Sequence, residues 1–163
     1  VNSMMNIIRY IATAIITAFM ALTTVNPSRA EEIDLVKDLN ELRLSLIKAG
    51  FKIRFEKPPM QSTYGLINTK KKVIWIAPIT QQMRIFRTTF LHEAVHAAQT
   101  CRTGSLQPIG WMPDVDEAVK IAIESILYRN YESEKFDIER EAFLMQGQPD
   151  AVPKIRRELK EHC

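Results

Sequence analysis

The spacing of hydrophobic residues predicts an amphipathic helix and then a strand in the first third of the chain. A set of four leucines recurs at intervals of three and four residues, which is the period of one helix face: Leu35, Leu39, Leu42 and Leu46. Asp34 fits the N-cap of this helix and Gly50 fits its C-terminal stop. Residues 51–55 then alternate apolar and charged side chains, which indicates a strand with one buried face.

Two runs with the composition of β-strands predict a hairpin. Residues 64–67 and 73–76 flank the polar segment 68–72, whose composition is typical of a turn. Pro78 follows the second run and ends the strand, because proline cannot donate to a sheet ladder. We therefore expect a small antiparallel sheet in this part of the chain.

A helix is predicted over residues 81–103, with Thr80 as its N-cap and Gly104 as its end. Residues 104–113 have the composition of a loop. We interpret Trp111 in this loop as a packed connector residue, and a role in lining a substrate cleft is the alternative.

Three more helices are predicted after this loop. Asp114 and Glu117 resemble a capping pair that opens a helix through Leu127, and two further helices are expected over residues 132–146 and 151–161. The chain shows no internal repeat and no sign of a second-domain boundary. The predicted fold class is α+β, with the small sheet packed on a helical bundle.

The first 30 residues have the features of a secretory signal peptide. Arg9 precedes an apolar run without acidic residues over positions 10–25, and small side chains follow before Glu31. A membrane anchor is the alternative, but the run is short for a bilayer span. We expect cleavage after residue 30, a single domain over residues 31–163, export to the periplasm or the medium, and no stable anchor.

Charge and cysteine content narrow the function. The formal net charge of +3 falls to +1 when the signal peptide is removed, because Arg9 and Arg29 leave and no acidic residue does. This balance does not indicate nucleic-acid binding. Cys101 and Cys163 are the only cysteines, so an exported protein is expected to join them in one disulfide, with two free thiols as the alternative. The sequence does not indicate an oligomeric state.

The strongest chemical signal is an H-E-x-x-H motif on the helix predicted over residues 81–103. His92 and His96 are four residues apart and therefore project from one helix face, where two neutral imidazoles can hold one Zn²⁺. Glu93 lies beside the first histidine, where its carboxylate can act as a general base on a water that the metal activates. This combination points to hydrolysis.

In these residues the sequence resembles the gluzincin metallopeptidases, whose third zinc ligand is a glutamate on a later helix. Many members carry a small residue three positions after this glutamate, and Glu139 with Ala142 fits that pattern. The resemblance implies a zincin-like fold with the motif on a central helix, with His92, His96 and Glu139 as metal ligands and Glu93 as general base. Glu141 is the alternative ligand, about 200° around the helix from Glu139.

The sequence also departs from the family pattern. Phe143 stands where many members have an aspartate or asparagine that supports a ligating histidine, so the supporting residue is not identified. Tyr128 or Tyr131 can supply an oxyanion-stabilising hydroxyl, and ordinary helix packing is the other interpretation.

The function expected from the sequence is an exported zinc-dependent metallopeptidase that cleaves a polypeptide substrate. The first alternative is an exported binding or sensing module that holds the metal and cleaves nothing. The second is a partner-binding module in which the motif is accidental.

Overall fold

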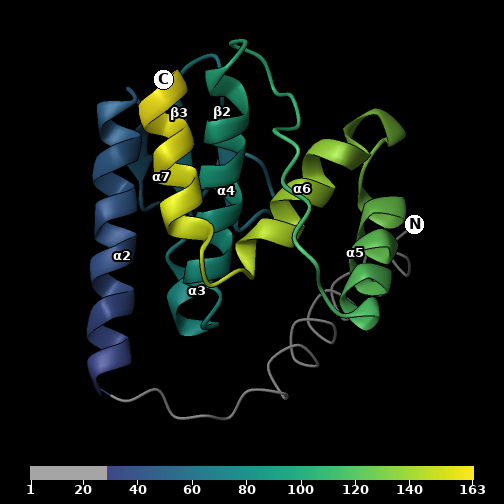
Figure 1. Cartoon of the computed structure of the whole chain (residues 1–163), viewed down its shortest axis with the longest axis horizontal. Coiled ribbons are helices and arrows are strands. Elements are labelled where there is room, and N and C mark those ends of the chain that lie inside the picture. The colour runs from purple at the N-terminus through teal and green to yellow at the C-terminus, as the bar shows by residue number, and fades with distance from the viewer. Residues whose placement is uncertain (1–28) are drawn as a thin grey trace. The chain divides into compact units, whose positions relative to one another are not determined.

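The structure is a computed structural model that describes residues 29–163 (Figure 1). The predicted signal peptide lies almost entirely outside the described residues. Residues Leu35–Cys163 form one compact unit, which contains every element after the start of α2. In chain order the elements are α2 (Arg29–Lys48), β1 (Lys52–Arg54), β2 (Gly65–Asn68), β3 (Val73–Ile76), α3 (Ile79–Gln82), α4 (Phe86–Cys101), α5 (Glu117–Asn130), the 3₁₀ turn η1 (Ser133–Lys135), α6 (Phe136–Gln146) and α7 (Ala151–His162). Among these helices, none is both long and apolar enough to cross a membrane.

The predicted α+β class is confirmed, but the sheet is mixed and not purely antiparallel. Its strand order is β1-β3-β2. The predicted hairpin is confirmed, since β2 pairs antiparallel with β3, whereas β1 pairs parallel with β3. Strand β3 occupies the centre because Val73, Ile74 and Ile76 are buried, so β1 and β2 each take one of its edges. Figure 1 shows the sheet behind the helices.

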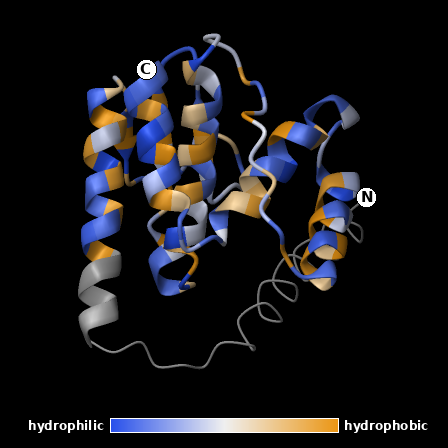
Figure 2. Cartoon of the chain, in the orientation of Figure 1, coloured by the Kyte–Doolittle hydropathy of each residue, from blue (hydrophilic) through white to orange (hydrophobic). Residues whose placement is uncertain are grey.

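Helix α4 lies at the centre of the Leu35–Cys163 unit. It packs against α6, α7, β2 and β3, and in Figure 1 it lies between α7 and α6. The surrounding helices are amphipathic, and hydrophobic residues alternate with hydrophilic ones along α2 and α7 (Figure 2). Their apolar faces form one core with α4 that includes Leu42, Leu46, Ile155 and Leu159.

The predicted single helix over residues 81–103 is in fact two helices. Arg84 adopts a left-handed conformation with φ of 56°, and the N–H of Ile85 donates to the Thr80 carbonyl at 2.9 Å, which closes α3. The turn carries Ile85 into the protein interior. Thr80 is not a helix cap, because its buried hydroxyl donates to the Ala77 carbonyl at 2.7 Å. Gly104, with φ of 75°, ends the segment after α4 as predicted.

Two other predicted helix starts are wrong, although the helices themselves are confirmed. Helix α2 begins at Arg29 and not after Asp34, because the intervening residues are mostly good helix formers. Helix α5 begins at Glu117, and the first turn forms where the N–H groups of Val119 and Lys120 donate to the Asp116 carbonyl. The predicted stop at Gly50 is confirmed by its φ of 90°.

A second, smaller core joins α5 to α6. Ile123 and Leu127 of α5 pack with Leu144 of α6, and the loop residue Val115 packs against them. Helix α6 is therefore supported on one side by α5 and on the other by α4. This support fixes the position of the glutamates on α6 relative to the motif helix.

The two cysteines form a disulfide, so the expected pairing is confirmed. Cys101 is the last residue of α4 and Cys163 is the last residue of the chain, and they are 62 residues apart in sequence. Beside this bridge, Arg102 donates two hydrogen bonds to the buried Glu158 of α7, at 2.5 and 3.0 Å. The C-terminal helix is thus joined to the end of the motif helix by both a covalent bond and an ion pair.

Replacing both cysteines with serine is expected to lower the free energy of unfolding by about 2–4 kcal/mol, because the bridge restricts a long loop in the unfolded chain. Urea denaturation of the double variant measures this change, with the unmodified protein under reducing conditions as the control. A change below about 0.5 kcal/mol, within the range of ordinary surface substitutions, would contradict this structural role for the bridge.

Candidate metal centre

Helix α4 presents both motif histidines toward α6. Most of its other residues between them and on either side are apolar and fully buried, namely Leu91, Ala94, Val95, Ala97 and Ala98. The four-residue spacing places His92 and His96 on one face, and their Nε2 atoms are 3.1 Å apart. Their rings meet edge to face with centroids 4.7 Å apart. The core therefore holds the two imidazoles in a fixed relative position.

Glu139 of α6 meets both histidines. Its Oε2 atom is 3.2 Å from His92 Nε2 and 3.4 Å from His96 Nε2. The candidate ligand atoms of the three residues all lie within 4.8 Å of one another, and within residues 29–163 this is the only group of three histidine, cysteine or acidic side chains that could share an ion. The structure thus brings together the three residues predicted to bind metal.

Glu141, the alternative ligand, has a different partner set. Its side chain is 2% exposed and points toward the loop after α4. It accepts hydrogen bonds from the backbone N–H groups of Ile109, Gly110 and Trp111, at 2.9, 2.6 and 2.5 Å. A carboxylate that already accepts three backbone hydrogen bonds would have to lose them in order to bind a metal. Of the two glutamates, Glu139 is therefore the candidate ligand.

The three converging groups fit a divalent cation by their chemistry. Two neutral imidazole nitrogens that face each other at 3.1 Å repel unless a proton or a cation lies between them. Two histidines and one carboxylate are also a ligand set that catalytic zinc sites use, with a position left for water. His92, His96 and Glu139 would hold such an ion.

The charges in the cluster shift one another's titration. Burial opposes the charge on Glu139, but its hydrogen bonds to His92 and His96 outweigh this effect and hold its pKa well below the usual range. Burial likewise opposes protonation of His96, yet the contact with Glu139 raises the pKa of this imidazole. The cluster therefore stabilises positive charge, whether a proton or a metal ion supplies it.

Glu93 lies next to the cluster without an assigned partner. Its side chain is 7% exposed and makes no hydrogen bond to another described residue. Because no fully buried side-chain oxygen among these residues lacks a partner, the Glu93 carboxyl keeps a small contact with solvent. Burial raises the pKa of this carboxyl, and His92 and His96 oppose the shift only in part. A carboxyl whose pKa is raised by burial beside a candidate metal site is suited to take up and return a proton.

Strand β2 packs directly on Glu93 at Gly65. A Cβ atom at position 65 would lie 2.5 Å from Glu93 Oε1 and 2.8 Å from Thr89 Cγ2, both closer than real contacts allow. Gly65 is therefore required for close approach and not for backbone conformation, because its φ is not in the left-handed region. The sheet edge and the carboxyl of Glu93 are in contact only because this residue has no side chain.

Two glutamines occupy the supporting positions that the sequence left unidentified. The Nδ1 atom of His96 is 2.7 Å from Gln99 Oε1, and the Nδ1 atom of His92 is 3.1 Å from Gln146 Oε1. Neither lies at position 143, where the family pattern places the supporting residue. A signal existed, since Gln146 follows Glu139 by seven residues, which is two helical turns on the same face.

Aromatic residues complete the surroundings. Phe143 packs its ring against His92 with centroids 4.7 Å apart, so this position gives a hydrophobic wall and no second ligand support. Tyr131 lies near Glu139 and Glu93, and its burial together with their negative charge raises the pKa of its phenol. Tyr128, by contrast, is 74% exposed and packs on Phe136. Of the two candidate tyrosines, only Tyr131 lies near the cluster.

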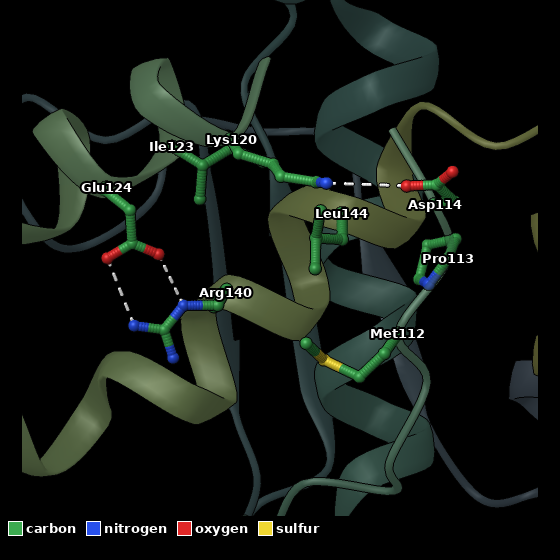
Figure 3. A pocket seen from close by; sticks show the side chains of 8 residues that line it. All are labelled: Met112, Pro113, Asp114, Lys120, Ile123, Glu124, Arg140 and Leu144. Carbon is green, nitrogen blue, oxygen red and sulfur yellow. Dashed lines mark hydrogen bonds and ion pairs between the residues drawn. The ribbon is translucent and has the colours of Figure 1, made fainter. Parts of the chain in front are cut away.

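A separate cavity of about 300 Å³ opens between α5, α6 and the loop that precedes α5 (Figure 3). Its charged groups are already paired, since Arg140 donates to both Glu124 oxygens at 2.6 and 3.2 Å and Lys120 reaches Asp114 at 3.4 Å. None of the three candidate metal ligands lines it; the lining residues are Met112, Pro113, Asp114, Lys120, Ile123, Glu124, Arg140 and Leu144.

The predicted packing of Trp111 is confirmed, since this residue is partly buried against the main core. Comparisons with protein-family models, with curated proteins and with solved structures find no match to this chain.

Proposed function

We propose that this protein is an exported zinc-dependent metallopeptidase of minimal gluzincin type. The observation that carries the proposal is the convergence of His92, His96 and Glu139, with the buried and unpartnered Glu93 beside them. The zincin-like description of the fold is part of the same proposal. It is supported by the central position of α4 and by the delivery of the third side chain from a later helix.

The residues of the chain have distinct chemical tasks in this proposal. Bound Zn²⁺ would act as a Lewis acid that lowers the pKa of a water molecule and polarises the scissile carbonyl. Glu93 takes the proton of the attacking water and delivers it to the leaving amine, because its raised pKa lets it do both. The Tyr131 hydroxyl, held near Glu139, is a hydrogen-bond donor for the oxygen that becomes negative during attack.

The free edge of β2 supports a polypeptide as the substrate. This strand is at the edge of the sheet and contacts Glu93 at Gly65. An extended peptide can pair with such an edge through backbone hydrogen bonds, which places its amides beside the reacting groups. A backbone-mediated mode of this kind needs few side-chain contacts.

Export is supported by the Cys101–Cys163 disulfide, because such bonds persist mainly in oxidising compartments. The predicted signal peptide agrees with this assignment, although its residues lie outside those the structure describes.

The function is tested with the purified protein and a fluorescently labelled denatured protein as substrate. Cleavage should require zinc: a chelator should abolish it, and added Zn²⁺ should restore it, whereas added Mg²⁺ should not. Cleavage that persists fully after chelation would exclude the proposed chemistry.

A further inference from the structure

The amide of Gln99 bridges the motif helix and α6. Gln99 is 1% exposed, and its Oε1 atom is 2.7 Å from His96 Nδ1. Its Nε2 atom donates to the Ile138 carbonyl at 3.0 Å and to Glu141 Oε2 at 2.7 Å. All of the polar atoms of this buried side chain thus have partners, which come from two helices.

The partners of Gln99 determine which way its amide faces. A carbonyl and a carboxylate accept hydrogen bonds and do not donate them, so both must face the NH₂ group. The amide oxygen is then left facing His96, and an oxygen requires a donor. His96 therefore carries its proton on Nδ1 when it is neutral, and its Nε2 lone pair is free toward His92 and Glu139.

Glu141 holds the amide of Gln99 in this orientation and also holds the loop. Its Oε2 atom accepts from Gln99 and from the N–H of Ile109, while its Oε1 atom accepts from Gly110 and Trp111. Four donors thus surround one buried carboxylate. The loop, Glu141, Gln99 and His96 form a continuous hydrogen-bonded chain that ends at the candidate metal centre.

We propose that Gln99 and Glu141 are positioning residues that set the tautomer of His96 and so prepare its Nε2 atom to bind a metal ion, while tying residues 109–111 to the same centre. The proposal rests on the proposed metal site but not on hydrolysis. The Oε1 atom of Gln146 likewise lies 3.1 Å from Nδ1 of His92, and the Nε2 atoms of both histidines face the cluster.

The first test reads the tautomer directly in the metal-free protein. Long-range ¹H–¹⁵N NMR spectra, recorded at a pH high enough for neutral imidazoles, distinguish a proton on Nδ1 from one on Nε2. His96 is expected to carry the proton on Nδ1. A proton on Nε2 in the unmodified protein would overturn the proposal, and this result does not depend on whether the protein binds zinc or cleaves peptides.

The second test measures zinc affinity by competition with a chelator. Gln99→Met removes the acceptor while keeping the side-chain size, and it should weaken zinc binding about 10- to 100-fold. Gln107→Met is the control for the same chemical change, because Gln107 is exposed in the loop between α4 and α5. The zinc affinity of this variant should equal that of the unmodified protein. Equal affinity in Gln99→Met and the unmodified protein would overturn the proposal.

Glu141→Gln provides an independent variant if Gln99→Met does not fold. One of the two carboxylate oxygens becomes an NH₂ group, so two of the four donors lose their acceptor whichever way the new amide turns. Zinc affinity should fall by a similar factor. Unchanged affinity and an unchanged His96 tautomer in a folded variant would contradict the role of Glu141. Absence of zinc binding in the unmodified protein would instead remove the proposed function and leave the tautomer test in force.

Discussion

Glu93→Gln should abolish peptide hydrolysis while leaving one zinc ion bound. The amide keeps the size of the side chain but cannot accept and return a proton, so we expect the rate of cleavage to fall by at least about 100-fold. Zinc binding should persist because Glu93 is not one of the three converging ligands. Removing a buried carboxyl that makes no hydrogen bond with the described residues should not lower stability.

The measurement combines a cleavage assay with elemental analysis of the same sample. Glu141→Gln serves as the comparison, since that variant is expected to weaken zinc binding while Glu93 remains intact. If Glu93→Gln retained both zinc and full activity, Glu93 would not be the general base. If the unmodified protein and Glu93→Gln both bound zinc and neither cleaved any substrate, a metal-binding or sensing module would be the better description.

Gly65→Ala should produce a similar separation of zinc binding from hydrolysis. The added Cβ would lie 2.5 Å from Glu93 Oε1, so the carboxyl must move away from its position beside the cluster. Displacement of a catalytic group by about 1 Å can cost about 100-fold in rate, and we expect a loss of that size. The three candidate ligands come from α4 and α6 and not from β2, so zinc content should remain stoichiometric.

Gly147→Ala is the matched control for this substitution. No atom lies within 4 Å of a Cβ built at Gly147, and its φ of −93° suits an alanine. The control should retain both zinc and activity. Full activity in Gly65→Ala would show that contact between β2 and Glu93 does not position the carboxyl.

The motif helix could be predicted because two independent patterns coincide in it. The apolar spacing marks α4 as buried, and the His92–His96 spacing places two imidazoles on one face of any helix. The hairpin of β2 and β3 was predictable for a similar reason, since the turn between them is local in sequence. Features determined by nearest neighbours along the chain are therefore the ones that sequence patterns identify.

Non-local contacts account for what sequence patterns did not identify. The choice between Glu139 and Glu141 depends on a loop some 30 residues earlier, whose N–H groups occupy Glu141. The parallel pairing of β1 with β3 depends on which edge of the buried central strand is free. The turn at Arg84 depends on the burial of Ile85. In each case a tertiary partner decides between local conformations of similar energy.

The most direct test of the central claim is the zinc content of the purified protein and of three variants, after equilibration with zinc at neutral pH. We predict one zinc per chain in the unmodified protein and in Glu141→Ala, and loss of zinc in His96→Ala and in Glu139→Ala. The Glu141 variant should bind more weakly but should still fill at a saturating zinc concentration. No bound zinc in the unmodified protein, or full zinc content in His96→Ala, would contradict the proposed metal centre.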